Sequence, residues 1–129
     1  MQILETKGDE RGSLIALESN LNAPFEIKRV YYIFGTKPNV RRGFHAHKNL
    51  KQILIAVAGS CKILLDDGKN NKQELLLNSP NQALLIEDLT WREMFDFSSD
   101  CVLLVLASDY YNESDYIRNY QDFLNYVNR

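Results

Sequence analysis

Short runs of apolar or alternating residues recur along the chain, and each run is followed by a turn signal. The runs lie at 13–17, 25–34, 41–47, 51–58, 61–66, 73–77, 82–86, 92–97 and 101–107. Glycine, proline, asparagine and aspartate stand between them, and Asp67-Gly68 suits a tight hairpin because both residues tolerate positive φ. Runs this short and evenly spaced predict an all-β fold, an antiparallel sandwich or barrel, and not βαβ units.

The last segment, residues 112–127, has a different period. Its apolar positions are Tyr116, Tyr120, Phe123, Leu124 and Val127. Spacings of three and four predict one or two short C-terminal helices, broken near Asn119, with Asn112 or Ser114 as an N-cap. The aromatic stripe fits two places equally well, the outside of the barrel and a subunit interface.

Length and composition describe an ordinary globular protein. A chain of 129 residues with 45% hydrophobic and 25% charged residues predicts a single domain over 1–129. A formal charge of −2 gives no reason to expect a nucleic-acid or membrane partner, and no apolar run approaches the length of a membrane span. Cys61 and Cys101 lie in apolar runs and are predicted to be reduced core residues. The charged N-terminus does not resemble a signal peptide, so we expect a cytoplasmic protein.

The two histidines of the chain, His45 and His47, stand two residues apart on a predicted strand. On a regular strand Arg41, Gly43, His45 and His47 share one face, and Arg42, Phe44 and Ala46 share the other. Two imidazoles beside a guanidinium suit a pocket wall, where Gly43 would leave room for a ligand. A solvent-facing strand is the alternative. The continuously apolar run that follows argues against it, because the hairpin expected there would be buried on both faces.

A histidine pair at this spacing is also a common metal-binding pattern. Four residues separate His47 from Gln52, and six more lead to Gly59. This spacing resembles the first motif of the cupin superfamily, whose metal-binding members place Glu where Gln52 stands and add a third histidine. The amide and the missing histidine leave an incomplete set of ligands, so we expect no metal and no other cofactor. The imidazoles remain free for proton transfer, with Tyr31 or Tyr32 on the preceding strand as a source of a phenol.

Basic residues gather just before the histidines. Arg41, in phase with them on a regular strand, is the first candidate to clamp a phosphate, followed by Arg11 and Arg92. The chain has no glycine-rich phosphate loop, nucleotide-binding fingerprint or nucleophilic triad. A phosphorylated substrate would therefore be held by arginine side chains.

The segment from Lys28 to Gly68 contains RVYYIF, RRGFHAHKNLKQ and GSCKILLDDG, and WREM follows at 91–94. These motifs resemble the dTDP-sugar 3,4-ketoisomerases, also described as WxcM-like cupins, and the likeness runs over most of the chain. The resemblance implies a metal-independent cupin-type jelly roll that forms a homodimer by exchanging N-terminal strands. It implies an enzyme that moves the ketone of dTDP-4-keto-6-deoxyglucose from C4 to C3, ahead of 3-amino sugar synthesis.

Matched to the family, His45 carries a proton between C3 and C4, and His47 with Tyr31 relays protons between the two oxygens. The residues expected to bind substrate are Arg41, Arg11, Gln52 and Arg92. Two alternatives share the fold: a dTDP-4-keto-sugar 3,5-epimerase, and a cupin that binds a sugar nucleotide without turnover. A metal-dependent dioxygenase is disfavoured by the incomplete ligand set.

Overall fold

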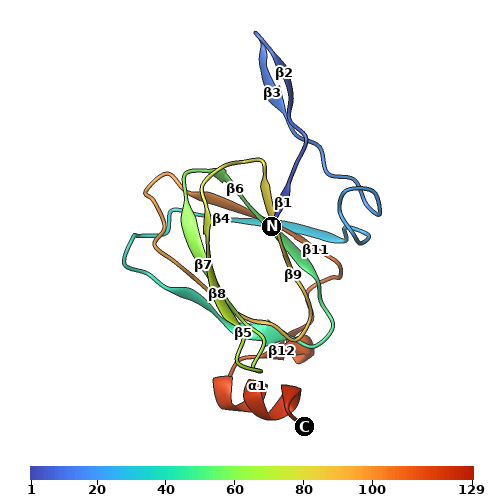
Figure 1. Ribbon diagram of the computed structural model, residues 1–129, viewed down its shortest axis with the longest axis vertical. Helices are drawn as coiled ribbons and strands as arrows, with labels where there is room; N and C mark the ends of the chain where they lie inside the picture. Colours follow the sequence, from blue (N-terminus) through green and yellow to red (C-terminus); the bar gives the residue numbers. More distant parts are fainter.

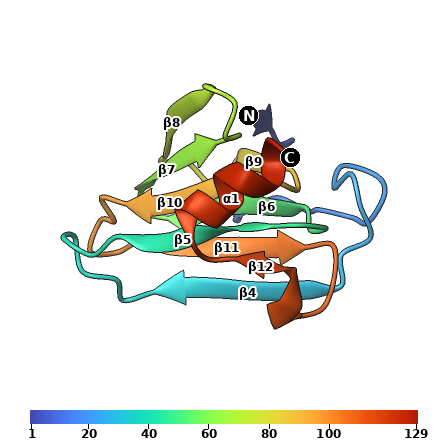
Figure 2. The same ribbon diagram turned by 90° about the horizontal axis from the view of Figure 1, so that it is seen from below.

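The computed structural model describes residues 1–129 and contains two five-stranded antiparallel sheets that face each other as a jelly-roll barrel (Figures 1 and 2). The elements are β1 Gln2–Ile3, β2 Lys7–Asp9, β3 Gly12–Leu14, β4 Arg29–Phe34, β5 Arg42–His47, β6 Gln52–Ala58, β7 Cys61–Asp66, β8 Lys72–Leu77, β9 Gln82–Ile86, β10 Trp91–Phe95, β11 Val102–Ala107, β12 Tyr116–Ile117 and α1 Tyr120–Val127. One sheet has the order β1-β9-β6-β11-β4 and the other β12-β5-β10-β7-β8. The predicted all-β antiparallel fold is confirmed.

The core lies between the sheets and follows the period of two along each strand. Leu54 and Leu103 from the first sheet meet Ile63 and Leu77 from the second, and each is at most 2% exposed. On β4, alternate residues turn inward, so Tyr31 packs on this core whereas Tyr32 is 61% exposed. Of the two candidate tyrosines, only Tyr31 therefore enters the barrel.

The hairpin predicted between residues 41–47 and 51–58 does not form. β5 and β6 lie in opposing sheets, β5 between β12 and β10, and β6 between β9 and β11. After Gln52, β6 is continuously apolar because its outer face is covered too: Ile53 and Ile55 pack under Leu4 and Phe25 of the N-terminal segment. As a result, the inward side chains of β5 and β6 enter the barrel from two different sheets.

The C-terminal segment is helical only in part. The break predicted near Asn119 is confirmed, because the Asn119 side chain caps α1 by accepting from the amide of Asp122. The predicted N-cap Asn112 is also confirmed, because it caps a short 3₁₀ helix, η1 Glu113–Asp115. The prediction was wrong for Tyr116, which lies on β12, where it pairs with β5, and not on a helix. α1 packs against the barrel through Phe123, whose ring centroid lies 5.8 Å from that of Trp91.

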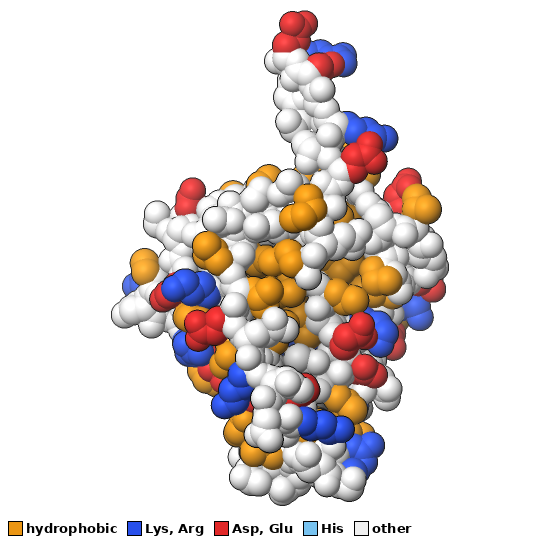
Figure 3. Space-filling view, viewed as in Figure 1, with side chains coloured by type: hydrophobic (Ala, Val, Ile, Leu, Met, Phe, Trp, Pro, Cys, Tyr) orange, Lys and Arg blue, Asp and Glu red, His pale blue; other side chains and the backbone are white.

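An arm made of β2 and β3 projects away from the barrel (Figure 1). Its tip carries charged side chains (Figure 3), and Arg11 there pairs with Asp9 at 2.6 Å. Cys61 and Cys101 are buried, unpaired thiols, as predicted. No helix in the structure is long and apolar enough to cross a membrane.

Candidate active site

A cavity of about 610 Å³ opens between β4 of one sheet and β5 and β12 of the other. Tyr31, His45 and Tyr116 line it together with three arginines, Arg29, Arg42 and Arg118. The cavity is therefore a mixed surface of aromatic rings, one imidazole and positive charge, and such a surface suits an anionic ligand.

β5 contains an irregularity that changes which side chains face this cavity. Arg92 of β10 pairs with His45 and Glu93 pairs with Gly43, so Phe44 is an extra residue with a φ of 58°. One extra residue reverses the alternation of a strand. Arg42 therefore lines the cavity with His45, and the prediction that Arg41 shares the histidine face was wrong.

Arg41 instead lies beside β10. Its Nε donates to Oε1 of Glu93 at 2.7 Å, and its guanidinium stacks on Phe95 at 4.0 Å from the ring centroid. Gly43 adopts a φ of 93°, and a Cβ there would lie 2.8 Å from the carbonyl oxygen of Arg92. The glycine predicted to admit a ligand is thus required by the close approach of the neighbouring strand.

His45 presents a free base to the cavity. Its Nδ1 lies 3.1 Å from the carbonyl oxygen of Gly43, which can only accept, so Nδ1 carries the proton of the neutral ring. Burial, followed by the positive charge of Arg92, lowers the pKa of His45 to about 3. At neutral pH the ring is uncharged, and its Nε2 keeps a lone pair that can take a proton.

His47 lies behind this wall. Its side chain is 1% exposed, and its Nδ1 is 3.0 Å from Oδ2 of Asp115. The His45 and His47 rings meet edge to face at 5.0 Å, and the Tyr116 ring lies 4.3 Å from His47. Burial and then the positive charge of Arg92 lower the pKa of His47 to about 3.

A chain of hydrogen bonds orients the hydroxyl group of Tyr31. The buried guanidinium of Arg92 donates to Oε1 of Gln52 at 2.5 Å, and Nε2 of Gln52 donates to the Tyr31 oxygen at 3.1 Å. A guanidinium can only donate, which fixes the orientation of the amide, so Tyr31 accepts from Gln52. The phenol proton of Tyr31 is therefore free to be donated to another group.

The residues predicted from the sequence fall into three places. His45 and Tyr31 line the cavity, whereas His47, Gln52 and Arg92 are buried behind it. Arg41 packs against β10, and Arg11 lies on the projecting arm. The first two groups form one connected site, and Arg41 and Arg11 of this chain are not part of it.

Sequence reasoning missed five residues of the site: Arg29, Arg42, Asp115, Tyr116 and Arg118. Arg118 stacks on Tyr116 at 4.2 Å from the ring centroid and forms two hydrogen bonds with Glu113. Two signals in the sequence pointed to them: Arg29 and Arg42 belong to the basic residues just before the histidines, and Tyr116 belongs to the aromatic stripe of the C-terminal segment, which resembled an amphipathic helix. Pairing of β12 with β5 brings this segment to the histidines.

The donor set does not fit a metal ion. No group of three or more His, Cys, Asp or Glu side chains lies close enough together to hold one. Nδ1 of each histidine already faces an acceptor, Gly43 or Asp115.

A family model described as "WxcM-like, C-terminal" matches residues 1–128. The chain is 59% identical over 119 residues to a TDP-4-oxo-6-deoxy-alpha-D-glucose-3,4-oxoisomerase of Aneurinibacillus thermoaerophilus, and the match covers 92% of this chain and 85% of the relative. A 3,4-ketoisomerase structure from Helicobacter canadensis superposes with a TM-score of 0.95 at 55% identity, over 98% of this chain and 95% of that one.

A third comparison adds a ligand. A histidine-to-asparagine mutant of the 3,4-ketoisomerase QdtA from Thermoanaerobacterium thermosaccharolyticum was solved in complex with TDP-4-keto-6-deoxyglucose. It superposes with a TM-score of 0.95 at 44% identity and covers 98% of this chain and 91% of that one.

Proposed function

The chain belongs to the WxcM-like family, and we propose that it is a TDP-sugar 3,4-ketoisomerase. Its substrate would be TDP-4-keto-6-deoxyglucose, whose ketone moves from C4 to C3. One observation carries the proposal: His45 and Tyr31 line the same cavity. The uncharged imidazole of His45 has a free Nε2, and the phenol of Tyr31 has a proton that is free to be donated.

The chemistry requires one carbon-bound and one oxygen-bound proton to move. The C4 carbonyl acidifies the proton on C3, and the Nε2 of His45 removes it to give an enediol(ate). His45 then delivers this proton to C4, O3 loses its proton and O4 gains one. The substrate and the product are therefore isomers, and the reaction needs no oxidant or reductant. Tyr31 is suited to supply the proton to O4, and the proton that leaves O3 would pass to His47 and from there restore the Tyr31 phenol.

The diphosphate would bind to the arginines that line the cavity. Arg42 has no acidic partner in the structure, and Arg29 stacks on Tyr31 at 5.3 Å from the ring centroid. A planar guanidinium binds phosphate oxygens through two donors. We therefore assign this role to Arg42 and Arg29 in place of Arg41; an Arg42→Ala variant with unchanged KM would refute the assignment.

Isotope exchange tests the proposed function. Incubated with TDP-4-keto-6-deoxyglucose in D₂O, the enzyme should form a 3-keto product, with any deuterium entering at C3 and C4, as followed by NMR. The His45→Asn variant should lose turnover by about 10²–10⁴-fold while remaining folded. Deuterium at C5 would indicate a 3,5-epimerase, and tight TDP binding without any reaction would indicate a non-catalytic binding protein.

The arm and the free cysteines support two further parts of this proposal. The arm makes few contacts with its own barrel, and a homodimer in which the two subunits exchange arms would bury it against the barrel of the other subunit. A monomer in analytical ultracentrifugation would contradict this dimer. A cytoplasmic location agrees with two unpaired thiols.

The 3-keto product would supply a 3-amino-3,6-dideoxyhexose for surface glycans such as O-antigen.

A further inference from the structure

The carboxylate of Asp115 connects its own turn to the end of β5, a segment that is distant in sequence. Its Oδ2 lies 3.0 Å from Nδ1 of His47, and its Oδ1 accepts from the backbone amide of Asn49 at 2.7 Å. The carbonyl oxygen of Asp115 accepts from the amide of Lys48 at 3.0 Å. Both side-chain oxygens and the backbone are therefore fixed against the end of β5.

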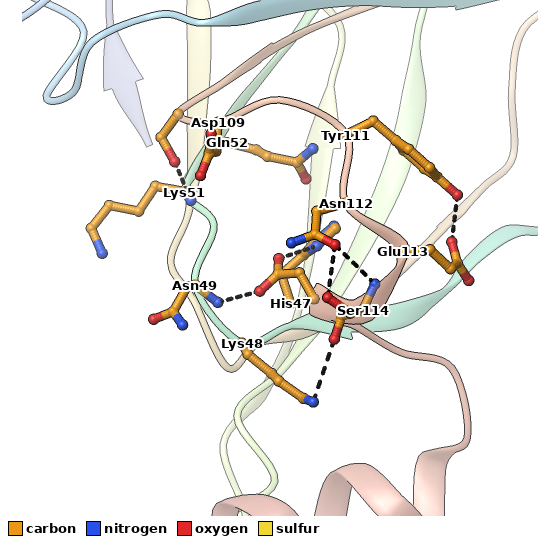
Figure 4. Close-up of polar contacts among 12 residues, drawn as sticks. His47, Lys48, Asn49, Lys51, Gln52, Asp109, Tyr111, Asn112, Glu113 and Ser114 are labelled. Carbon is orange, nitrogen blue, oxygen red and sulfur yellow. Dashed lines mark hydrogen bonds and ion pairs between the residues drawn. The ribbon is translucent and has the colours of Figure 1, made fainter.

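The turn that carries Asp115 is itself held in place. The Asn112 side chain accepts from the amide and the hydroxyl of Ser114, at 3.1 and 2.7 Å, which closes the turn at residues 113–115 (Figure 4). Tyr116, the next residue, pairs with His47 in the β12–β5 ladder. The position of Asp115 relative to the imidazole is thus fixed by structure on both sides of it.

We propose that Asp115 is a positioning residue that sets the tautomer of His47. This inference rests on the proposed isomerase function, in which His47 exchanges protons with the site. A carboxylate can only accept, so it holds the proton of the neutral imidazole on Nδ1 and leaves Nε2 as an acceptor. Nε2 of His47 is buried and has no partner within the chain, so it remains available to receive a proton.

The same contact stabilises the ring after it has taken a proton. An imidazolium in a buried site next to Arg92 is costly, and an adjacent carboxylate offsets part of that cost. Asp115 does not line the substrate cavity. Its removal should therefore lower kcat and leave KM nearly unchanged.

The Asp115→Asn variant gives a sharp test because its orientation can be deduced. An NH₂ group at the position of Oδ1 would face the backbone N–H of Asn49 donor to donor, so the oxygen of the new amide stays there and its NH₂ group turns to His47. An NH₂ group can only donate, so the imidazole proton must move to Nε2. We expect kcat to fall by about 10²–10⁴-fold, with KM within about threefold.

The chain offers a matched control and a conservative replacement. Asp109→Asn removes an equal charge from an exposed position in the same loop, where the carboxylate accepts only from the neighbouring amide of Tyr110, and it should leave kcat unchanged. Asp115→Glu keeps a carboxylate and should keep the Nδ1–H tautomer of His47, even where its longer side chain lowers kcat.

The tautomer can be read directly, because only two histidines contribute signals to the ¹⁵N spectrum of histidine-labelled protein. Wild type and Asp109→Asn should show His47 protonated on Nδ1, and Asp115→Asn should show it on Nε2, with His45 unchanged. An Nε2–H tautomer in wild type overturns the proposal, even if Asp115→Asn does not fold. A normal kcat in Asp115→Asn also overturns it, whereas an inactive wild type with the expected tautomer refutes only the proposed function.

Discussion

β6 borders two different interiors within one barrel. At its start Gln52 points inward and bonds to Arg92 and Tyr31, and two residues later Leu54 points inward among apolar side chains. The two positions are equally buried, each 2% exposed. β10 makes the same change, from Arg92 to Met94.

The two halves are held by different forces. In the apolar half the free energy of folding comes from burial and close packing, which depend on volume more than on direction. In the polar half the groups are compatible with burial only while each hydrogen bond keeps its donor and its acceptor in place. We expect substitutions in the first half to change stability, and substitutions in the second to change activity.

Leu54→Ala should have the largest effect, on stability. Loss of this side chain from a cluster of thirteen buried residues should lower the free energy of unfolding by about 2–5 kcal/mol. Urea unfolding measures the change, and kcat of the folded fraction should remain near that of wild type. A large loss of kcat with unchanged stability would show that the two halves are not independent.

Gln52→Glu tests the polar half at nearly the same depth. A carboxylate can accept from Arg92 but cannot donate to Tyr31, so the Tyr31 hydroxyl would donate to it and turn its proton away from the cavity. We expect kcat to fall by about 10–100-fold, with little change in unfolding free energy because Arg92 gains a charged partner.

A double-mutant cycle shows whether this loss acts through the phenol. Tyr31→Phe removes the hydroxyl, so adding Gln52→Glu to it should cause little further loss of kcat. Losses that multiply would show that Gln52 contributes through a group other than Tyr31.

The sequence predicted most of the fold because its strands have regular periods and its turns have clear signals. It identified His45 as a cavity residue and Tyr31 as the inward tyrosine by resemblance. It assigned Arg41 and Arg42 to the wrong faces of the strand. The face of a strand residue is inferred from strict alternation, and the one bulged residue, Phe44, reverses that alternation for the residues before it. Positive φ at a phenylalanine gives no signal in composition or pattern.

The other misses arise from contacts between distant parts of the chain. Asp115 lies 68 residues from His47 in sequence, and only the β12–β5 pairing brings them together. Tyr116 was assigned to a helix because its spacing from Tyr120 suits one, whereas tertiary pairing determines its conformation. Gln52 is predicted to bind substrate from the sequence alone, and only the folded chain shows that it is buried and donates to Tyr31.

The smallest expected effect is the pH dependence of the free energy of unfolding, which comes from the histidines of the polar half. The pKa of each histidine is about 3 in the folded protein, through burial and then Arg92, and about 6.5 in the unfolded chain. Above pH ~6.5 neither state binds the proton, and below it only the unfolded state does, so the free energy of unfolding falls as pH falls toward 3.

At pH 5.5 this loss should be about 1.4 kcal/mol for each histidine, measured by urea unfolding between pH 7.5 and 5.5. Both pKa values are lowered to about 3, so the two histidines should contribute equally, and His45→Asn should lose about half of the pH dependence. Leu54→Ala contains both histidines and should follow wild type in parallel, with the same deficit at each pH. If the Leu54→Ala deficit changed with pH while His45→Asn retained the full slope, the titrating groups would lie outside the polar half.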